Sequence, residues 1–200
     1  TNYLDTWDFG EVDDFIKNNR PDLLAFSSTS GDYPYYNDLN RKLKAKYGIM
    51  SVMGGPHATF HGKRFMASES NTLDGACVGE GEYALLDLCE NLEAGRGYTN
   101  IPNWIFPITS DNPPPRSPKL AVFECGRDSI IVNPVRPLIE DLDTLPIPDF
   151  SLDPDFHNTK KLVFWFHRGC PYKCTYCMNH AWNKMYKEVN KTVGLQKLVR

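Results

Sequence analysis

Segments of helical and strand character alternate along the first half of the chain, and this order limits the fold more than any other feature. Apolar residues recur at helical spacing in three segments: Gly10–Asn19, Tyr35–Tyr47 and Tyr83–Leu92. Short apolar runs between them predict three buried strands: Asp22–Ser28, Ile49–Met53 and Gly75–Val78. Such alternation favours a parallel, doubly wound α/β sheet over residues 1–100. Between Gly54 and Gly75 the sequence predicts a turn followed by an irregular stretch.

Prolines are frequent after Gly95 and interrupt regular elements, which predicts a linker over residues 101–158. Three short extended pieces within it are expected to pair as antiparallel strands: Asn103–Phe106, Leu120–Glu124 and Ser129–Val132. A strand, a loop and a helix are then expected within residues 159–200: Leu162–Phe166, His167–Asn179 and Val189–Arg200. One such unit cannot bury its own faces, so we expect this second domain to be truncated.

The charge of the chain favours a small-molecule substrate over a nucleic acid. The formal net charge is -3, whereas nucleic-acid binding is usually marked by a basic patch or a basic domain. Apolar stretches such as Leu23–Phe26 fall far short of the roughly 20 residues that cross a bilayer. No charged and then apolar leader follows Thr1, so we expect a cytoplasmic protein without a membrane span.

Three of the six cysteines lie close together near the C-terminal end: Cys170, Cys174 and Cys177. The others are scattered and are expected to be small buried apolar side chains: Cys77, Cys89 and Cys125. The close grouping indicates a metal centre in a reducing compartment rather than disulfides. Three thiolates on one loop can bind a single centre and leave one coordination position open, which is typical of a catalytic site.

Two other interpretations of the cysteine loop stay open at this point. The loop could hold a structural zinc ion in a binding module without turnover, with His167 or His180 as the fourth ligand. It could also be part of an electron-carrying iron-sulfur motif. Gaps of three and two residues, with a glycine before and a tyrosine between the cysteines, are unusual for structural zinc, which prefers two pairs of ligands.

The segment Arg168–Cys177 resembles the signature loop of radical S-adenosylmethionine (radical SAM) enzymes. The resemblance implies that Cys170, Cys174 and Cys177 bind a 4Fe-4S cluster whose fourth iron is chelated by S-adenosylmethionine. It further implies that Tyr176 lies near the adenine, and that reductive cleavage yields a 5'-deoxyadenosyl radical. The fold implied for residues 159–200 is the start of a radical SAM (β/α) partial barrel, and the implied partner is an electron donor such as flavodoxin or ferredoxin.

Small and hydroxyl-bearing residues follow the first two predicted strands, in Ser27–Ser30 and in Gly54–Thr59. Doubly wound sheets bind ligands beyond the carboxyl ends of their strands, so both loops are candidate ligand contacts. Two glycines would let a flat ligand approach the main chain. A Gly-Gly pair before a proline is equally typical of a simple turn.

Together with the cysteine loop, three segments resemble the cobalamin-dependent subclass of radical SAM enzymes: Gly54–Thr59, Val78–Glu82 and Leu138–Asp149. The resemblance implies a flavodoxin-like, cobalamin-binding domain that lacks its first strand here. It implies that the nucleotide tail of cobalamin is enclosed by four residues: Ser27, Thr29, Gly54 and Gly55. The Asp-x-His-x-x-Gly motif that supplies a cobalt ligand in many cobalamin proteins is absent from this sequence, so the lower axial ligand is left open.

His57 is expected to contact the nucleotide tail or the backbone rather than cobalt. The other histidines are expected to be ordinary surface or packing residues: His61, His157, His167 and His180. Glu80 and Glu82 precede or begin a helix and are expected to stabilise its N-terminus rather than to act in catalysis.

The resemblance implies methyl transfer to an unactivated carbon as the reaction. A radical SAM enzyme that closes rings or rearranges substrates without cobalamin is the alternative. The substrate-binding residues of such an enzyme are expected beyond Arg200, so we expect this piece of chain to be inactive by itself.

Overall fold

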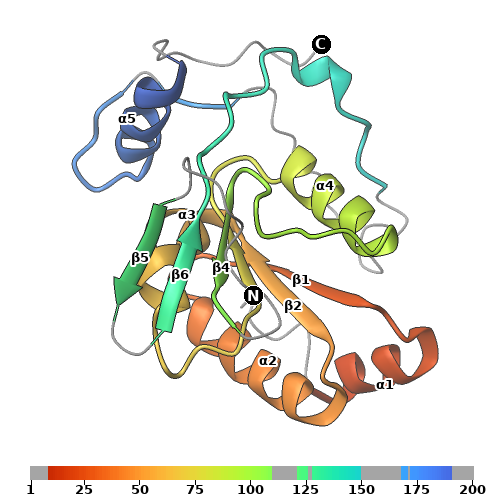
Figure 1. Ribbon diagram of the computed structural model, residues 1–200. Coiled ribbons are helices and arrows are strands. Elements are labelled where there is room, and N and C mark those ends of the chain that lie inside the picture. Colours follow the sequence, from red (N-terminus) through yellow and green to blue (C-terminus); the bar gives the residue numbers. More distant parts are fainter. Residues whose placement is uncertain (1–8, 110–120, 126–127, 150–167, 171, 191–200) are drawn as a thin grey trace. The chain divides into compact units, whose positions relative to one another are not determined.

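The computed structural model describes residues 9–109, 121–125, 128–149, 168–170 and 172–190 (Figure 1). The chain divides into two compact units, residues 1–136 and residues 137–200. Each unit is described here by itself.

The first unit is a six-stranded sheet with helices on both faces (Figure 1). Its helices are α1 (Phe9–Asn19), α2 (Tyr33–Tyr47), α3 (Gly55–Met66) and α4 (Glu82–Glu93). Its strands are β1 (Leu23–Ser27), β2 (Met50–Gly54), β3 (Gly75–Cys77), β4 (Trp104–Pro107), β5 (Ala121–Cys125) and β6 (Asp128–Val132). Strands β1, β2 and β3 are neighbours and run parallel, which confirms the predicted α/β fold.

The short strands expected in the linker exist, but they continue the sheet of the first unit. The strand order is β1-β2-β3-β4-β6-β5, and every pairing from β3 to β5 is antiparallel. The first unit therefore reaches Arg136 and does not end at residue 100 as the sequence analysis expected. Among the described residues, Pro102 precedes β4, Pro107 ends it and Pro134 follows β6, so none of these prolines interrupts a strand. The expected boundary near residue 158 lies outside the described residues.

Helix α3 corrects the prediction of an irregular stretch after Gly54. Gly54 is its N-cap, Gly55 has φ +82°, and Pro56 lies in its first turn. A proline in the first turn loses no hydrogen bond, because the first N–H groups of a helix have no partner within it. The same three residues therefore start a helix here instead of closing a turn.

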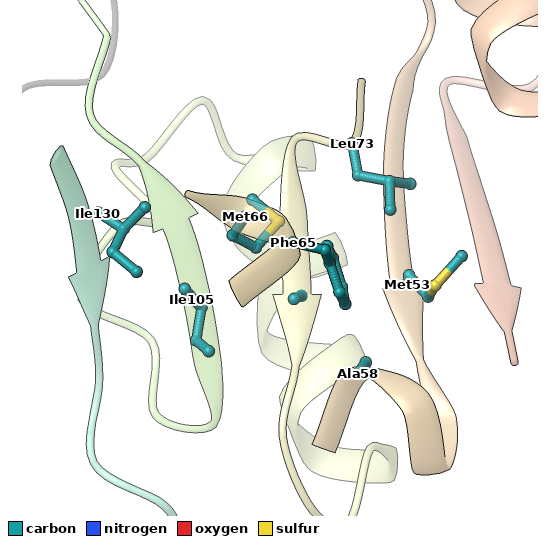
Figure 2. Close-up of a cluster of buried hydrophobic side chains, with 8 residues drawn as sticks. Met53, Ala58, Phe65, Met66, Leu73, Ile105 and Ile130 are labelled. Carbon is teal, nitrogen blue, oxygen red and sulfur yellow. The ribbon is translucent and has the colours of Figure 1, made fainter. Parts of the chain in front are cut away.

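Helices α3 and α4 cover opposite faces of the sheet. Met53 packs with residues of α3 in one core cluster (Figure 2), whereas its neighbour Val52 packs with residues of α4 in another. Adjacent strand residues point to opposite faces, so β2 is buried on both sides. Trp104 on β4 completes the α4 face, where its indole N–H donates a hydrogen bond of 2.9 Å to the carbonyl oxygen of Ala84.

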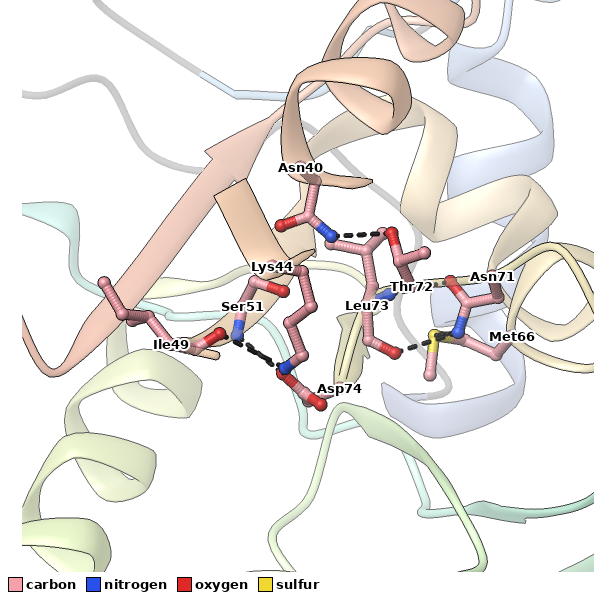
Figure 3. A network of polar contacts seen from close by, with 9 residues as sticks. All are labelled: Asn40, Lys44, Ile49, Ser51, Met66, Asn71, Thr72, Leu73 and Asp74. Carbon is pink, nitrogen blue, oxygen red and sulfur yellow. Dashed lines mark hydrogen bonds and ion pairs between the residues drawn. The ribbon is translucent and has the colours of Figure 1, made fainter. Parts of the chain in front are cut away.

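A polar network fixes helix α2 at the amino ends of β2 and β3 (Figure 3). The ammonium group of Lys44 pairs with the carboxylate of Asp74 and donates to the carbonyl oxygen of Ile49 at 3.2 Å. The same carboxylate accepts the N–H of Ser51 at 2.7 Å. On the preceding turn of α2, the Asn40 amide donates to the Thr72 hydroxyl at 2.8 Å. This network lies at the strand starts, so the carboxyl ends of the strands stay clear of it.

The described residues of the second unit include a short 3-10 turn, η1 (Leu142–Thr144), and a helix, α5 (Asn179–Asn190). The sequence predicted a loop up to Asn179 and a helix over Val189–Arg200, so α5 begins earlier than expected. Trp182 and Tyr186 are one helical turn apart, and their rings lie 5.1 Å from each other. The expected strand Leu162–Phe166 and residues 191–200 lie outside the described residues.

None of the helices in the described part of the chain is long and apolar enough to cross a membrane.

Candidate cofactor-binding sites

The first candidate site is the carboxyl edge of β1 and β2, where Gly55 is pressed against the end of β1. A Cβ atom on Gly55 would lie 2.8 Å from the hydroxyl oxygen of Ser27 and 2.9 Å from the amide nitrogen of Ser28. Its φ of +82° is also one that residues with a side chain rarely adopt. Glycine is therefore the residue that this close approach requires.

Main-chain hydrogen bonds join the two loops at this edge. The Ser28 N–H donates to the carbonyl oxygen of Gly54 at 3.3 Å, and the His57 N–H donates to that of Ser28 at 2.9 Å. The Thr29 hydroxyl donates to the carboxylate of Asp32 at 2.6 Å. The loop after β1 is thus held both by the loop after β2 and by its own residues.

The loop after β3 is fastened to the same edge by Thr59 of helix α3. The Thr59 hydroxyl donates to the carbonyl oxygen of Gly55 at 3.0 Å and accepts the N–H of Gly79 at 3.1 Å. From the other side, the Asn103 amide donates to the carbonyl oxygen of Val78 at 2.7 Å, and the Val78 N–H donates to that of Asn103 at 2.7 Å. Three loops at the carboxyl ends of parallel strands are therefore linked into one surface.

His57 stands at this edge within an aromatic group. Its ring stacks on Tyr33 with centroids 4.0 Å apart and lies 5.0 Å from His61 and 5.6 Å from Phe65. Its Nδ1 lies 3.0 Å from the hydroxyl oxygen of Ser30. Burial, and then the neighbouring His61, lower the pKa of His57, which favours the neutral imidazole.

The second candidate site is the cysteine loop of the second unit. Cys170, Cys174 and Cys177 are all unpaired, and Cys174 is exposed. The Cys177 N–H donates to the carbonyl oxygen of Cys174 at 3.1 Å, and the Asn183 amide of α5 donates to that of Cys170 at 2.9 Å. Tyr176 is 91% exposed and so makes little contact with the protein.

The donor set of this loop fits an iron-sulfur cluster, although the thiols are not gathered into a finished site. Three unpaired cysteines on one short loop are the ligands that such clusters use. Among the residues that the structure describes, no three His, Cys, Asp or Glu side chains are arranged to hold a metal ion. The ligands are thus present without the arrangement that a bound cluster would impose.

A family model for the B12 binding domain matches residues 6–89. We call these matched residues, 6–89, the B12-binding domain. The match confirms the resemblance noted in the sequence, and the parallel strands β1 to β3 between helices agree with the flavodoxin-like fold expected for it.

Three relatives align over most of the chain. An uncharacterized methyltransferase of Pyrococcus horikoshii is 29% identical over 84% of this chain and 34% of its own length. The anaerobic magnesium-protoporphyrin IX monomethyl ester cyclase of Rubrivivax gelatinosus is 25% identical over 88% of this chain and 30% of its own length. The hopanoid C-3 methylase of Methylococcus capsulatus is 27% identical over 90% of this chain and 29% of its own length.

The chain thus spans about a third of the length of these relatives. The part of the chain that the hopanoid C-3 methylase leaves unaligned amounts to about 20 residues, and Cys177 lies more than 20 residues from either end. Because the hopanoid C-3 methylase aligns over 90% of the chain, its similarity extends past the B12-binding domain and across the cysteine loop.

The B12-binding domain brings together the residues predicted at its strand ends. Ser27 faces the Cβ position of Gly55, while Gly54 and His57 hydrogen bond with Ser28. Thr29 contacts Asp32 and lies in the same loop. Tyr33 and Asn103 were not predicted, and Thr59 was placed in a candidate loop without its role of joining two loops. A histidine pair four residues apart would have indicated helix α3 and its exposed face.

The structure agrees with some of the predictions for the scattered cysteines and the glutamates and contradicts one of them. Cys77 is buried as expected, and burial raises the pKa of its thiol to about 12. Cys89 is exposed, so the prediction of a buried side chain is wrong there; its place on the outer face of α4 is the reason. Gly81 is the N-cap of α4, and Glu82 lies in its first turn, where a negatively charged carboxylate interacts favourably with the helix dipole. The side chain of Cys125 lies outside the described residues.

Proposed function

We propose that the protein acts as a cobalamin-binding radical SAM enzyme that transfers a methyl group to an unactivated carbon of a small molecule. One observation carries the proposal: a B12-binding domain and a Cys-x3-Cys-x2-Cys loop occur in the same chain. Two of the relatives are named a methyltransferase and a methylase, which supports methyl transfer. When bound, the cluster with S-adenosylmethionine supplies a carbon radical, and the corrinoid supplies the methyl group.

The residues of the chain bind and position these groups. Cys170, Cys174 and Cys177 hold three irons of a 4Fe-4S cluster through their thiolates and leave the fourth iron open. Tyr176, which is exposed beside Cys177, is free to lie against an adenine ring. The exposed loop around Cys174 also leaves the cluster within reach of an electron donor such as flavodoxin or ferredoxin.

At the B12-binding domain, four residues enclose the nucleotide tail in this proposal: Ser27, Thr29, Gly54 and Gly55. The missing side chain of Gly55 lets the loop after β2 pack against Ser27 and Ser28, and this packing forms the edge along which the tail would lie. The hydroxyls of Ser27 and Thr29 stand at the end of β1 and can donate or accept hydrogen bonds. His57 adds an imidazole already held in place by Tyr33 and Ser30.

A second candidate reaction is ring closure without use of cobalamin. The relative from Rubrivivax gelatinosus is named a cyclase, so similarity over the B12-binding domain does not by itself specify methyl transfer.

The cluster is tested by anaerobic reconstitution of the full-length protein with iron and sulfide. About four irons per chain and the broad visible absorption of iron-sulfur proteins are expected, together with reductive cleavage of S-adenosylmethionine. Cys174→Ala should abolish all three, whereas Cys89→Ala, which alters an exposed cysteine of α4, should retain them. Zinc without iron or sulfide, or an active Cys174→Ala variant, would contradict the proposal.

The corrinoid is tested separately, by titration of the same protein with hydroxocobalamin and gel filtration. Retention of one corrin per chain is expected. A protein that forms the cluster and cleaves S-adenosylmethionine but retains no corrin would favour the cyclase-type alternative.

A further inference from the structure

We propose that His57 and His61 form a two-imidazole site for a divalent transition metal ion on helix α3. The two residues are four positions apart, so their side chains project from the same face of the helix. Two histidines at this spacing on a helix are a recurrent way to bind zinc.

The separation of the two rings matches a shared metal ion. An imidazole nitrogen binds zinc at about 2.0–2.1 Å, which puts each ring centre roughly 3.2 Å from the metal. Two such rings at a tetrahedral angle have centres about 5 Å apart. The ring centroids of His57 and His61 are 5.0 Å apart, with 35° between the ring planes.

His57 also has the partner that a metal-binding imidazole normally has on its other nitrogen. Its Nδ1 lies 3.0 Å from the hydroxyl oxygen of Ser30, and the ring is stacked on Tyr33. Such a contact fixes the ring orientation and leaves Nε2 available as a ligand. In the part of the chain that the structure describes, the imidazole has no other hydrogen-bond partner.

The chemistry of two imidazoles selects borderline ions such as Zn²⁺, Ni²⁺, Co²⁺ or Cu²⁺ over Mg²⁺ or Ca²⁺. No third His, Cys, Asp or Glu of the described residues completes the set. The remaining coordination positions are therefore left to water or to a donor atom of another molecule. The site requires neither cluster nor corrinoid, so its failure would leave the proposed function standing.

The test is titration of the untagged full-length protein with Ni²⁺ by calorimetry, in a background of Cys170→Ser, Cys174→Ser and Cys177→Ser that removes the thiol ligands. One Ni²⁺ per chain is expected. Ser30→Ala should weaken its binding about tenfold, as the loss of an orienting partner does. His57→Ala and His61→Ala should each weaken it more, with unchanged circular dichroism.

A matched control moves one histidine along the same helix. His61→Ala combined with Lys63→His keeps the number of histidines on α3 but breaks the four-residue spacing, and it should bind no better than His61→Ala. Equal Ni²⁺ affinity in the parent and in His57→Ala or His61→Ala would overturn the site, and so would full affinity in the relocated variant.

Discussion

The loops at the carboxyl edge of the B12-binding domain and the cysteine loop of the second unit differ in how their shape is maintained. The first are fixed by protein contacts: Gly55 against Ser27 and Ser28, and Thr59 between two loops. In the described part of the cysteine loop, Cys170 and Cys177 are held through their main chains, whereas the Cys174 and Tyr176 side chains are exposed.

This difference indicates two ways of preparing a cofactor site. A site fixed by packing is formed before its ligand binds and loses little conformational entropy on binding. A site made of free thiols gains its final arrangement from the metal, because binding and local ordering are coupled. Substitutions should therefore disturb the first site in the free protein and the second only when its cofactor is present.

The largest effect is expected for Gly55→Ala. The new Cβ would meet main-chain atoms of Ser28, which cannot move aside as a flexible side chain can, and the φ of +82° adds strain. Together these should lower the free energy of unfolding by about 3 kcal/mol, measured by urea denaturation. The matched control is Gly95→Ala: its φ is +61° but nothing lies within 4 Å, so only about 1 kcal/mol is expected. Equal losses in the two variants would mean that the edge is not tightly packed.

A smaller effect is expected from one substitution made in both regions, cysteine to serine. Cys77 is buried on β3, so Cys77→Ser places a hydroxyl in an apolar core and should cost about 1–3 kcal/mol. Cys174→Ser changes an exposed side chain and should stay within about 0.5 kcal/mol in metal-free protein. Urea denaturation without iron measures both. A destabilising Cys174→Ser would show that the cysteine loop is organised without a cluster.

The loss of stability at low pH tests whether the network of fixed protein contacts extends to helices α1 and α2. Lys17, Lys46 and Tyr47 all donate to the Asp13 carboxylate and hold its pKa well below the ordinary value. The group therefore stabilises the fold above about pH 3.9, the ordinary value of an aspartate, and this contribution is lost as the pH falls further. In the Asp13→Asn variant, the urea concentration at the midpoint of unfolding should fall less between about pH 5 and pH 2.5 than in the parent protein. An unchanged slope would assign the acid sensitivity to other groups.

The alternation of helices and strands was sufficient to predict the parallel core from the sequence. Leu39 and Leu43 lie one turn apart and are buried on α2, and Gly48 ends that helix in the left-handed conformation, as its position predicts. Local patterns of this kind depend on neighbours in the sequence, so they can be read without the fold.

The missed features depend on contacts between distant residues. Helix α3 contains Gly62, a poor helix former, yet Gly62 lets the helix approach Ile105 of β4, where a Cβ would come within 3.2 Å. Strands β3 to β6 were predicted, but the pairing of β4 with β3 was not, since pairing across a sheet leaves no local signal. The edge loops were predicted as candidates, whereas Thr59 and Asn103 act through partners twenty or more residues away.

Asn103 shows what the reversal of strand direction after β3 makes possible. Because β4 runs back antiparallel, the residue before it arrives beside the loop after β3, and Asn103 adopts φ +73° there. Its hydrogen bonds to that loop use only main-chain atoms of Val78 and Glu80. The path of the loop is thus specified by a residue outside it, and substitutions of the loop's own side chains leave these hydrogen bonds intact.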